Sequence, residues 1–264
     1  MSTQALADIR TEIAERKFTQ AEEHLRALLP DLQGEENILG MDLLCGILRA
    51  TQRLDEACEV ARQELAKART CLTDKDLMLA NVLHNVAMTL DMAGQFAEAV
   101  PYAEEEVAIL RKTLRDDDPR LTDAILALGK HHYEQGHFAL ARDMMEECLA
   151  RYTKQSGRKS LGVSACLNNL GRILENLGDN EASLPLFAEA CAIREELLGS
   201  HEDTAFTLLN YGTALAALGR YQEASEKLLA CKDMYLALGL TDSPYLEACR
   251  DNLMLCWNKV CTPC

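Results

Sequence analysis

The residues most able to do chemistry are cysteines, and three of them gather near the end of the chain. Cys261 and Cys264 form a Cys-Thr-Pro-Cys motif, and Cys256 lies five residues before it. Thiols at this spacing can form a redox pair or bind a soft metal such as zinc. A thioredoxin-type motif belongs in a βαβ setting that this sequence lacks, and a closed zinc site needs four ligands. We therefore expect a thiol-rich tail without a metal or cofactor, and keep the redox or metal role as an alternative.

The histidines and acidic runs do not assemble into a catalytic or metal-binding set. His131 and His132 are adjacent, so on a helix they point about 100° apart and cannot chelate one ion together. His132 occupies an apolar position of the helical pattern, which predicts a core histidine. The runs 104–106 and 116–118 place three consecutive carboxylates on a helix or at its start, where they fan out into solvent. Since no phosphate loop, dinucleotide fingerprint or nucleophile elbow is present, we expect no catalytic residues and no enzyme activity.

The composition of the chain indicates which classes of partner and which cellular compartment to expect. The chain has 264 residues, a net charge of −15 and only 5% aromatic residues. This acidity disfavours nucleic acid and anionic membranes as partners, and the scarcity of aromatic and β-branched residues argues against a large sheet. No leader peptide or membrane-spanning stretch is recognisable. Eleven scattered cysteines without an export signal are typical of a reducing cytoplasm, so we expect a cytoplasmic protein.

An internal repeat is the main signal in the sequence. Gly94, Gly136 and Gly178 are each 42 residues apart, and Gly219 follows 41 residues later. Three of these glycines precede an aromatic residue by two positions, and a small residue lies seven positions before each glycine. The aromatic residues are Phe96, Phe138 and Tyr221, and the small residues are Ala87, Gly129, Gly171 and Gly212.

This spacing predicts a helix that ends at the glycine, in a left-handed conformation, and a second helix that begins at once. Pro101 and Pro185 fall early in two of these second helices, where we expect them in the first turn. Weaker copies at 17–21 and 53–57 extend the array to six helix pairs. The pairs are predicted at residues 1–33, 35–72, 76–115, 118–156, 160–199 and 202–239, followed by a capping helix at 243–260.

The segments Leu167–Gly171 and Ala190–Gly199, with the acidic linker Asp116–Pro119, carry a resemblance to the tetratricopeptide repeat (TPR) family. The usual unit has 34 residues, and the longer unit here is similar to the 42-residue variant of kinesin light chains. The resemblance covers nearly the whole chain. It implies an all-α, right-handed superhelical solenoid of about six helix pairs plus a capping helix, forming a single domain over 1–264. In this family the first helices line a concave face that holds an extended or helical segment of a partner protein.

Carried over by position, this resemblance assigns a partner-binding groove to the first helices. Asn85, Asn169 and Asn210 share the position two residues before the small residue, where an amide can grip a peptide backbone. The alternative is that each asparagine bridges neighbouring helices, and Ala127 interrupts the series in the fourth repeat. The predicted groove residues are Asn81, His84, Asn85, Met88, Lys130, Tyr133, Asn168, Asn169, Arg172, Asn176, Phe206, Asn210 and Thr213.

The sequence thus favours a non-catalytic scaffold that binds a protein or peptide partner in this groove. Two other functions stay open: a redox- or metal-responsive regulator acting through the terminal cysteines, and a scaffold that associates with itself as a homo-oligomer. Only Lys130 and Arg172 supply cations at groove positions. Capture of a carboxy-terminal acidic tail, as in chaperone-binding relatives, is therefore not expected.

Overall fold

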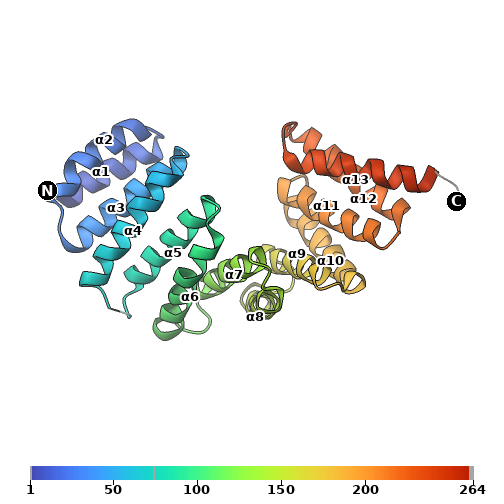
Figure 1. Cartoon of the computed structure of the whole chain (residues 1–264), viewed down its shortest axis with the longest axis horizontal. Helices are drawn as coiled ribbons and strands as arrows, with labels where there is room; N and C mark the ends of the chain where they lie inside the picture. Colours follow the sequence, from blue (N-terminus) through green and yellow to red (C-terminus); the bar gives the residue numbers. More distant parts are fainter. Residues whose placement is uncertain (1, 74, 262–264) are drawn as a thin grey trace. The chain divides into compact units, whose positions relative to one another are not determined.

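The computed structural model describes residues 2–73 and 75–261, and within them it contains only helices and connecting turns (Figure 1). The described residues hold thirteen α-helices in the chain order expected for six helix pairs and a capping helix, and the thirteenth is the predicted capping helix. The elements are α1 Ser2–Ala14, α2 Phe18–Leu28, a short 3₁₀ turn Leu29–Asp31, α3 Gly34–Ala50, α4 Leu54–Cys71, α5 Leu77–Met92, α6 Phe96–Thr113, α7 Pro119–Glu134, α8 Phe138–Ser156, α9 Leu161–Asn176, α10 Asn180–Leu198, α11 Glu202–Ala217, α12 Tyr221–Ala237 and α13 Pro244–Cys261.

The turn inside each pair has the left-handed residue that the spacing predicts. Gly94, Gly136, Gly178 and Gly219 have φ between +73° and +85°. After three of these glycines, the amide of the next residue donates to the carbonyl five residues before it, as in Gln95 N to Leu90 O at 2.8 Å, and this bond caps the first helix. In the two N-terminal pairs the left-handed positions belong to Arg16 and Gln52, residues with side chains, at φ of 58° and 60°.

Small residues allow the two helices of a pair to approach closely. A Cβ added to Gly171 would lie 2.6 Å from the Phe187 ring, and one added to Gly212 would lie 2.7 Å from Leu228. Both facing side chains are fully buried. The predicted small-residue position is therefore a packing requirement of the repeat in α9 and α11.

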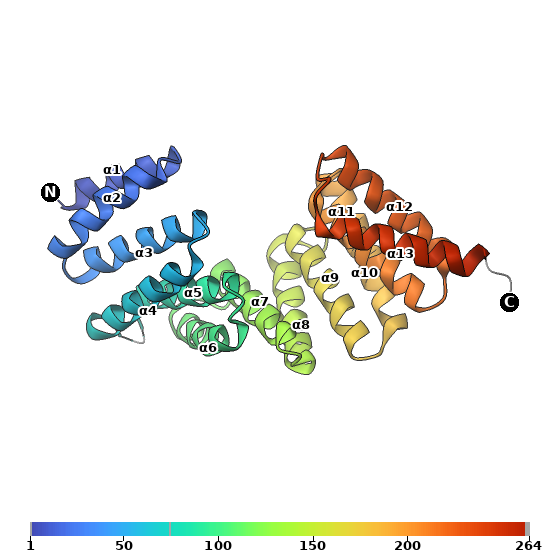
Figure 2. The same cartoon turned by 45° about the horizontal axis from the view of Figure 1, so that its top comes forward.

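The chain divides into two compact units, residues 1–135 and 136–264. The first holds α1 to α7 and the second holds α8 to α13, so the division lies inside the predicted fourth pair. Within the second unit each helix packs against the next along the chain, and α13 covers α12 (Figure 2). First helices also contact one another inside a unit: α1 with α3 and α3 with α5, then α9 with α11 and α11 with α13. Across the described residues, no helix has both the length and the hydropathy to cross a membrane.

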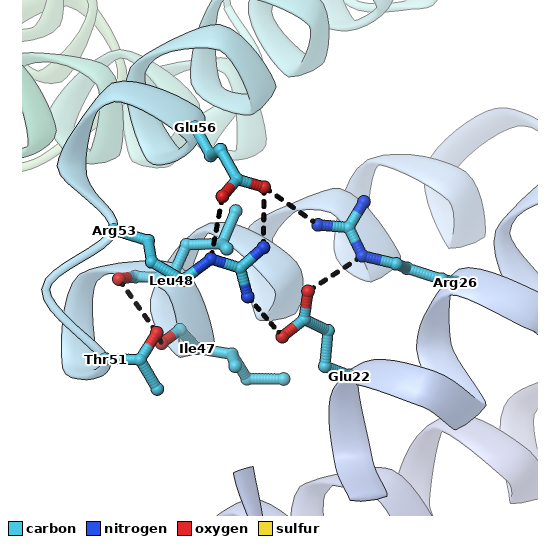
Figure 3. Close-up of polar contacts among 7 residues, drawn as sticks. All are labelled: Glu22, Arg26, Ile47, Leu48, Thr51, Arg53 and Glu56. Carbon is cyan, nitrogen blue, oxygen red and sulfur yellow. Dashed lines mark hydrogen bonds and ion pairs between the residues drawn. The ribbon is translucent and has the colours of Figure 1, made fainter. Parts of the chain in front are cut away.

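Ion pairs join successive second helices in the first unit. Figure 3 shows Arg53, at the start of α4, between Glu22 of α2 at 2.7 Å and Glu56 of its own helix at 2.6 Å, with Arg26 of α2 closing the set. Arg62 of α4 pairs in the same way with Glu98 of α6. Apart from Glu22, which is 15% exposed, these side chains are substantially exposed, so the ion pairs select the register of neighbouring repeats more than they stabilise the fold.

The prediction for the two prolines was wrong in one respect. Pro101 is the sixth residue of α6 and Pro185 the sixth residue of α10, so both lie in the second turn. A proline there has no amide to donate to the carbonyl four residues before it. Both prolines are exposed, which leaves that carbonyl open to solvent.

Candidate functional site

The predicted groove residues fall on first helices in both units. Those of the first unit lie on α5 and α7, and those of the second lie on α9 and α11. The two sets are therefore two separate candidate faces. The residues of the second face contact one another across three neighbouring helices, α9, α11 and α13.

Two of the three aligned asparagines bridge neighbouring first helices. Asn85 on α5 donates from Nδ2 to Asp42 Oδ1 on α3 at 2.6 Å. Asn210 on α11 donates from Nδ2 to Asn168 Oδ1 on α9 at 3.0 Å. Both bonds join the same pair of repeat positions, so for these asparagines the structure supports the bridging alternative. Asn168 is only 3% exposed, so its prediction as a groove residue was wrong: it is the buried acceptor that holds Asn210.

The third asparagine, Asn169, differs from its counterparts. It is half-buried and makes no side-chain hydrogen bond with any residue of 2–73 or 75–261. The repeat position that supplies an acceptor to Asn85 and Asn210 is occupied by Leu126 in the preceding repeat. A leucine cannot accept a hydrogen bond, so the Asn169 amide keeps its donors and acceptor for another partner.

An aromatic and cationic surface lies beside Asn169. The Arg172 guanidinium on α9 lies 6.0 Å from the centroid of the Phe206 ring on α11, within the outer range of a cation–π contact. The Phe206 ring meets Tyr245 of α13 edge-on, with centroids 4.9 Å apart. Tyr245 is 42% exposed and Phe206 half-buried, so the surface stays accessible. It offers apolar faces, a hydroxyl and a positive charge within one unit.

The helix α13 extends this face with two residues that sequence reasoning missed. Asn252 donates from Nδ2 to Thr213 Oγ1 of α11 at 3.2 Å, and Tyr245 contacts Phe206 as described. The signal was present, because Asn252 lies 42 residues after Asn210 and α13 begins where a seventh first helix would begin. Beside Tyr245, a hollow of about 370 Å³ is lined by Glu202 at the start of α11 and by residues 239–244, which connect α12 to α13. We name the set Asn169, Arg172, Phe206, Thr213, Tyr245 and Asn252 the α9–α11–α13 face.

Glu175 adds a titratable group next to this face. Burial raises its pKa to about 7, and the nearby charge of Arg172 opposes the shift only in part. The equivalent residues of the first unit, Arg49 and Asp91, are held by the next repeat, through Thr89 at 2.9 Å and His131 at 3.4 Å. In the repeat after Glu175, Ala214 of α11 occupies the position that Thr89 and His131 hold, so Glu175 has no such polar contact to the next repeat. Asn176, next to it, is exposed and donates to the Arg172 carbonyl.

The predicted residues of the first unit lie beside partly or fully buried histidines. His84 lies 3.2 Å from Glu106 of α6, and this hydrogen bond raises the pKa of His84. His131 is buried, and burial lowers its pKa despite the nearby Asp91. Its predicted neighbour in the core, His132, is also buried, at 4% exposure. Among the remaining predicted residues, Asn81 and Lys130 are exposed, and Met88 and Tyr133 are half-buried.

A buried carboxyl group, which sequence reasoning also missed, lies deeper in the first unit. Glu64 on α4 is 0% exposed, and neither of its oxygens has a hydrogen-bond partner among the described residues. Burial and the neighbouring Asp42 raise its pKa to about 8, and Arg49 opposes this. The residue is therefore neutral near pH 7, as expected for a carboxyl without an ion-pair partner in a core.

The cysteine candidates separate in the structure. The Cys256 sulfur is fully buried in the core of the second unit, and burial raises its pKa. The Cys261 side chain and Cys264 lie outside the described residues. Within the described part, no three histidine, cysteine or acidic side chains are arranged to hold a metal ion.

Comparisons with known proteins agree with the repeat. The family model for the tetratricopeptide repeat matches residues 36–112, 94–154, 120–196 and 163–237. The protein kinesin light chain-related 3 of Arabidopsis thaliana is 25% identical over 136 residues, which cover 52% of this chain and 21% of that protein. The chain thus spans about a fifth of the length of this curated relative.

Solved structures show the same fold. A putative kinesin light chain of Podosopora anserina with nearly identical TPR-like repeats has a TM-score of 0.67 at 22% identity, covering 78% of this chain and 99% of that one. A Rap protein complexed with Competence and Sporulation Factor has a TM-score of 0.70 at 16% identity, covering 96% and 73%. The family matches run from residue 36 to residue 237, over more than half of the chain and across the helix pairs described above, and the chain therefore belongs to the tetratricopeptide repeat family.

Proposed function

We propose that this protein is a non-catalytic scaffold in the cytoplasm that binds an extended or helical segment of a partner protein on its α9–α11–α13 face. The observation that carries the proposal is the contrast among the three aligned asparagines. The side-chain amides of Asn85 and Asn210 each donate a hydrogen bond to a neighbouring first helix. Asn169, by contrast, makes no side-chain hydrogen bond within the described residues. A half-buried side-chain amide without a hydrogen-bond partner costs free energy in the folded protein. A bound peptide backbone that pairs with the amide removes this cost.

The surroundings of Asn169 suit a peptide. Phe206 and Tyr245 provide apolar surface for a side chain, and Arg172 provides a charge that can meet a carboxylate or a carbonyl. Aromatic and arginine side chains dominate the energetics of protein interfaces, because they bury large areas and form directed contacts. Family membership supports a protein partner as well, since repeats of this type expose extended binding surfaces.

A structural relative is consistent with the proposal. The Rap protein that shares this fold was solved in complex with Competence and Sporulation Factor. The chain's net charge of −15 argues against nucleic acid as the partner and adds a weak preference for a basic or mixed-charge segment.

The proposal is tested by selecting binders from a displayed peptide library on the full chain and measuring their affinities for two variants. The first variant combines Asn169→Ala with Arg172→Ala, and the second carries Asn81→Ala on the exposed surface of α5 in the first unit. We expect the double variant to weaken selected peptides by at least tenfold, with an unchanged far-UV circular dichroism spectrum, and the α5 variant to bind like the native chain.

Equal affinity of all three proteins would remove the assignment to this face. A loss of affinity that accompanies a loss of folded signal would show that Asn169 and Arg172 have structural roles instead.

A further inference from the structure

A hollow of about 500 Å³ lies between α2, α3 and α4 in the first unit, and we name it the α2–α3–α4 hollow. Among the described residues that line it, Arg26 and Lys67 are cationic and none is acidic. The larger part of its lining is apolar and is formed mainly by Leu29, Met41, Leu44 and Val60. Apolar walls with a few polar groups, at this volume, are typical of sites that bind small molecules.

The hollow is open because α2 is short. Helix α2 has 11 residues, whereas α4 and α6 have 18 each, so α2 is about 10 Å shorter than these second helices. The chain leaves α2 through the 3₁₀ turn Leu29–Asp31, where Pro30 has no amide to continue the helical hydrogen bonds. On α4, residues 60, 63 and 67 share one helix face and line the hollow beside this turn. The early end of α2 therefore leaves this face of α4 accessible.

Asn37 contributes a hydrogen-bond acceptor that has no donor. It lines the hollow from α3 and is only 5% exposed. Its Nδ2 donates to the carbonyls of Leu29 at 3.0 Å and Leu32 at 3.2 Å, which fixes the 3₁₀ turn against α3. Its Oδ1 has no hydrogen-bond partner among the described residues. A buried acceptor without a donor costs free energy, and a ligand N–H group that pairs with it removes this cost.

Lys67 contributes a positive charge that no described residue neutralises. Its side chain lies on the exposed side of the hollow and forms no ion pair within residues 2–73 and 75–261. Arg26, by contrast, is paired with Glu22 at 2.8 Å and lies 3.4 Å from Glu56 (Figure 3). A carboxylate placed beside Lys67 would gain a charge-assisted hydrogen bond.

We propose that the α2–α3–α4 hollow binds a small amphipathic carboxylate that carries an amide N–H, the chemistry of an N-acyl amino acid with an apolar side chain. The apolar side chain packs against the apolar lining, the N–H donates to Asn37 Oδ1, and the carboxylate accepts from Lys67. The hollow belongs to the first unit, and the inference is independent of the proposed function of the α9–α11–α13 face.

The test is titration of the full chain with three compounds, followed by two-dimensional amide NMR. The probe is N-acetyl-L-leucine. N-acetyl-L-leucinamide lacks its charge, and isocaproate keeps the branched body and the carboxylate but lacks the N–H. We expect the probe to bind saturably with a Kd on the order of millimolar, and to shift amide signals of the turn 29–31, α3 and α4. Each analogue should bind about fivefold more weakly or worse.

Three variants locate the binding site. Lys67→Gln should weaken binding of N-acetyl-L-leucine by about fivefold or more and leave that of N-acetyl-L-leucinamide unchanged. Arg69→Gln is the matched control, because it removes one positive charge from the same helix outside the lining of the hollow, and it should bind like the native chain. Val60→Phe adds bulk to the wall of the hollow and should abolish binding of all three compounds.

The native chain and the three compounds decide the matter even if a variant fails to fold. Absence of saturable binding of N-acetyl-L-leucine, equal affinities for the three compounds, or signal shifts confined to other helices would overturn the inference. Native affinity in a folded Lys67→Gln variant would overturn it as well. So would a leucine-terminated peptide that binds about tenfold tighter or more, because the occupant would then be the end of a partner chain.

Discussion

The buried carboxyl group of Glu64 makes the stability of the first unit depend on pH in a defined direction. Its pKa is about 8 in the folded chain, against an ordinary value of 4.5. The folded state therefore holds a proton that the unfolded state has released at neutral pH. Stability from this group is fully present below about pH 4.5 and is lost as the pH rises through 8.

The magnitude follows from the same shift. Between these two pKa values the unfolding free energy falls by about 1.4 kcal/mol per pH unit, or about 2.7 kcal/mol from pH 5 to pH 7. Glu64→Gln keeps the shape and the neutral state of the protonated side chain but cannot release the proton. The variant should match the native chain near pH 5 and exceed its stability by about 2–3 kcal/mol near pH 7.

The assay is urea denaturation followed by circular dichroism at several pH values, with the m value checked for constancy. Glu59→Gln, at an exposed position on the same helix, is the matched control, and its stability should follow that of the native chain at every pH. If Glu64→Gln and the native chain lose stability in parallel as the pH rises, Glu64 is ionised in the folded protein and the reasoning fails.

Three other substitutions test the packing and the bridges of the second unit. Gly171→Ala should cost about 1–2 kcal/mol, because its Cβ would lie 2.6 Å from the buried Phe187 ring, and calorimetry should show a lower Tm. Arg194→Lys should lower the free energy of unfolding in urea by about 2–3 kcal/mol. The buried guanidinium donates to Ser164 of α9 and, at 2.7 Å, to the Asp203 carbonyl of α11, and one ammonium group cannot replace both bonds. An unchanged urea midpoint would contradict this. Asn210→Ala should cost about 1–3 kcal/mol by leaving a buried acceptor unpaired, whereas Asn169→Ala should leave the Tm unchanged, and equal effects in thermal melts would refute the distinction between the two asparagines.

The helix pairs could be predicted from the sequence because their signals are local. A glycine at the end of a helix, a small residue two turns before it and the apolar period all act within one repeat. The same left-handed turn forms at Arg16 and Gln52, where the pattern of the flanking helices outweighs the strain of a side chain. Pro101 was placed one turn too early, because helix starts are set by backbone hydrogen bonds that the residue pattern fixes only loosely.

The candidate site was only partly predictable, because its details depend on contacts between repeats. Asn85, Asn169 and Asn210 are alike in sequence, and they differ only in what the preceding repeat offers one position away: Asp42, Leu126 and Asn168. The burial of Glu64 arises in the same way, from contacts between helices. The division of the chain near residue 135 has no counterpart in the sequence, since the repeat spacing continues unchanged through Gly136.

The most direct test of the binding face is photo-crosslinking of a selected peptide that carries a photoreactive group, followed by mass spectrometric location of the adducts. We expect the adducts within α9, α11 and α13, and competition by unlabelled peptide should abolish them. Competable adducts confined to α10 and α12, or to the first unit, would contradict the account.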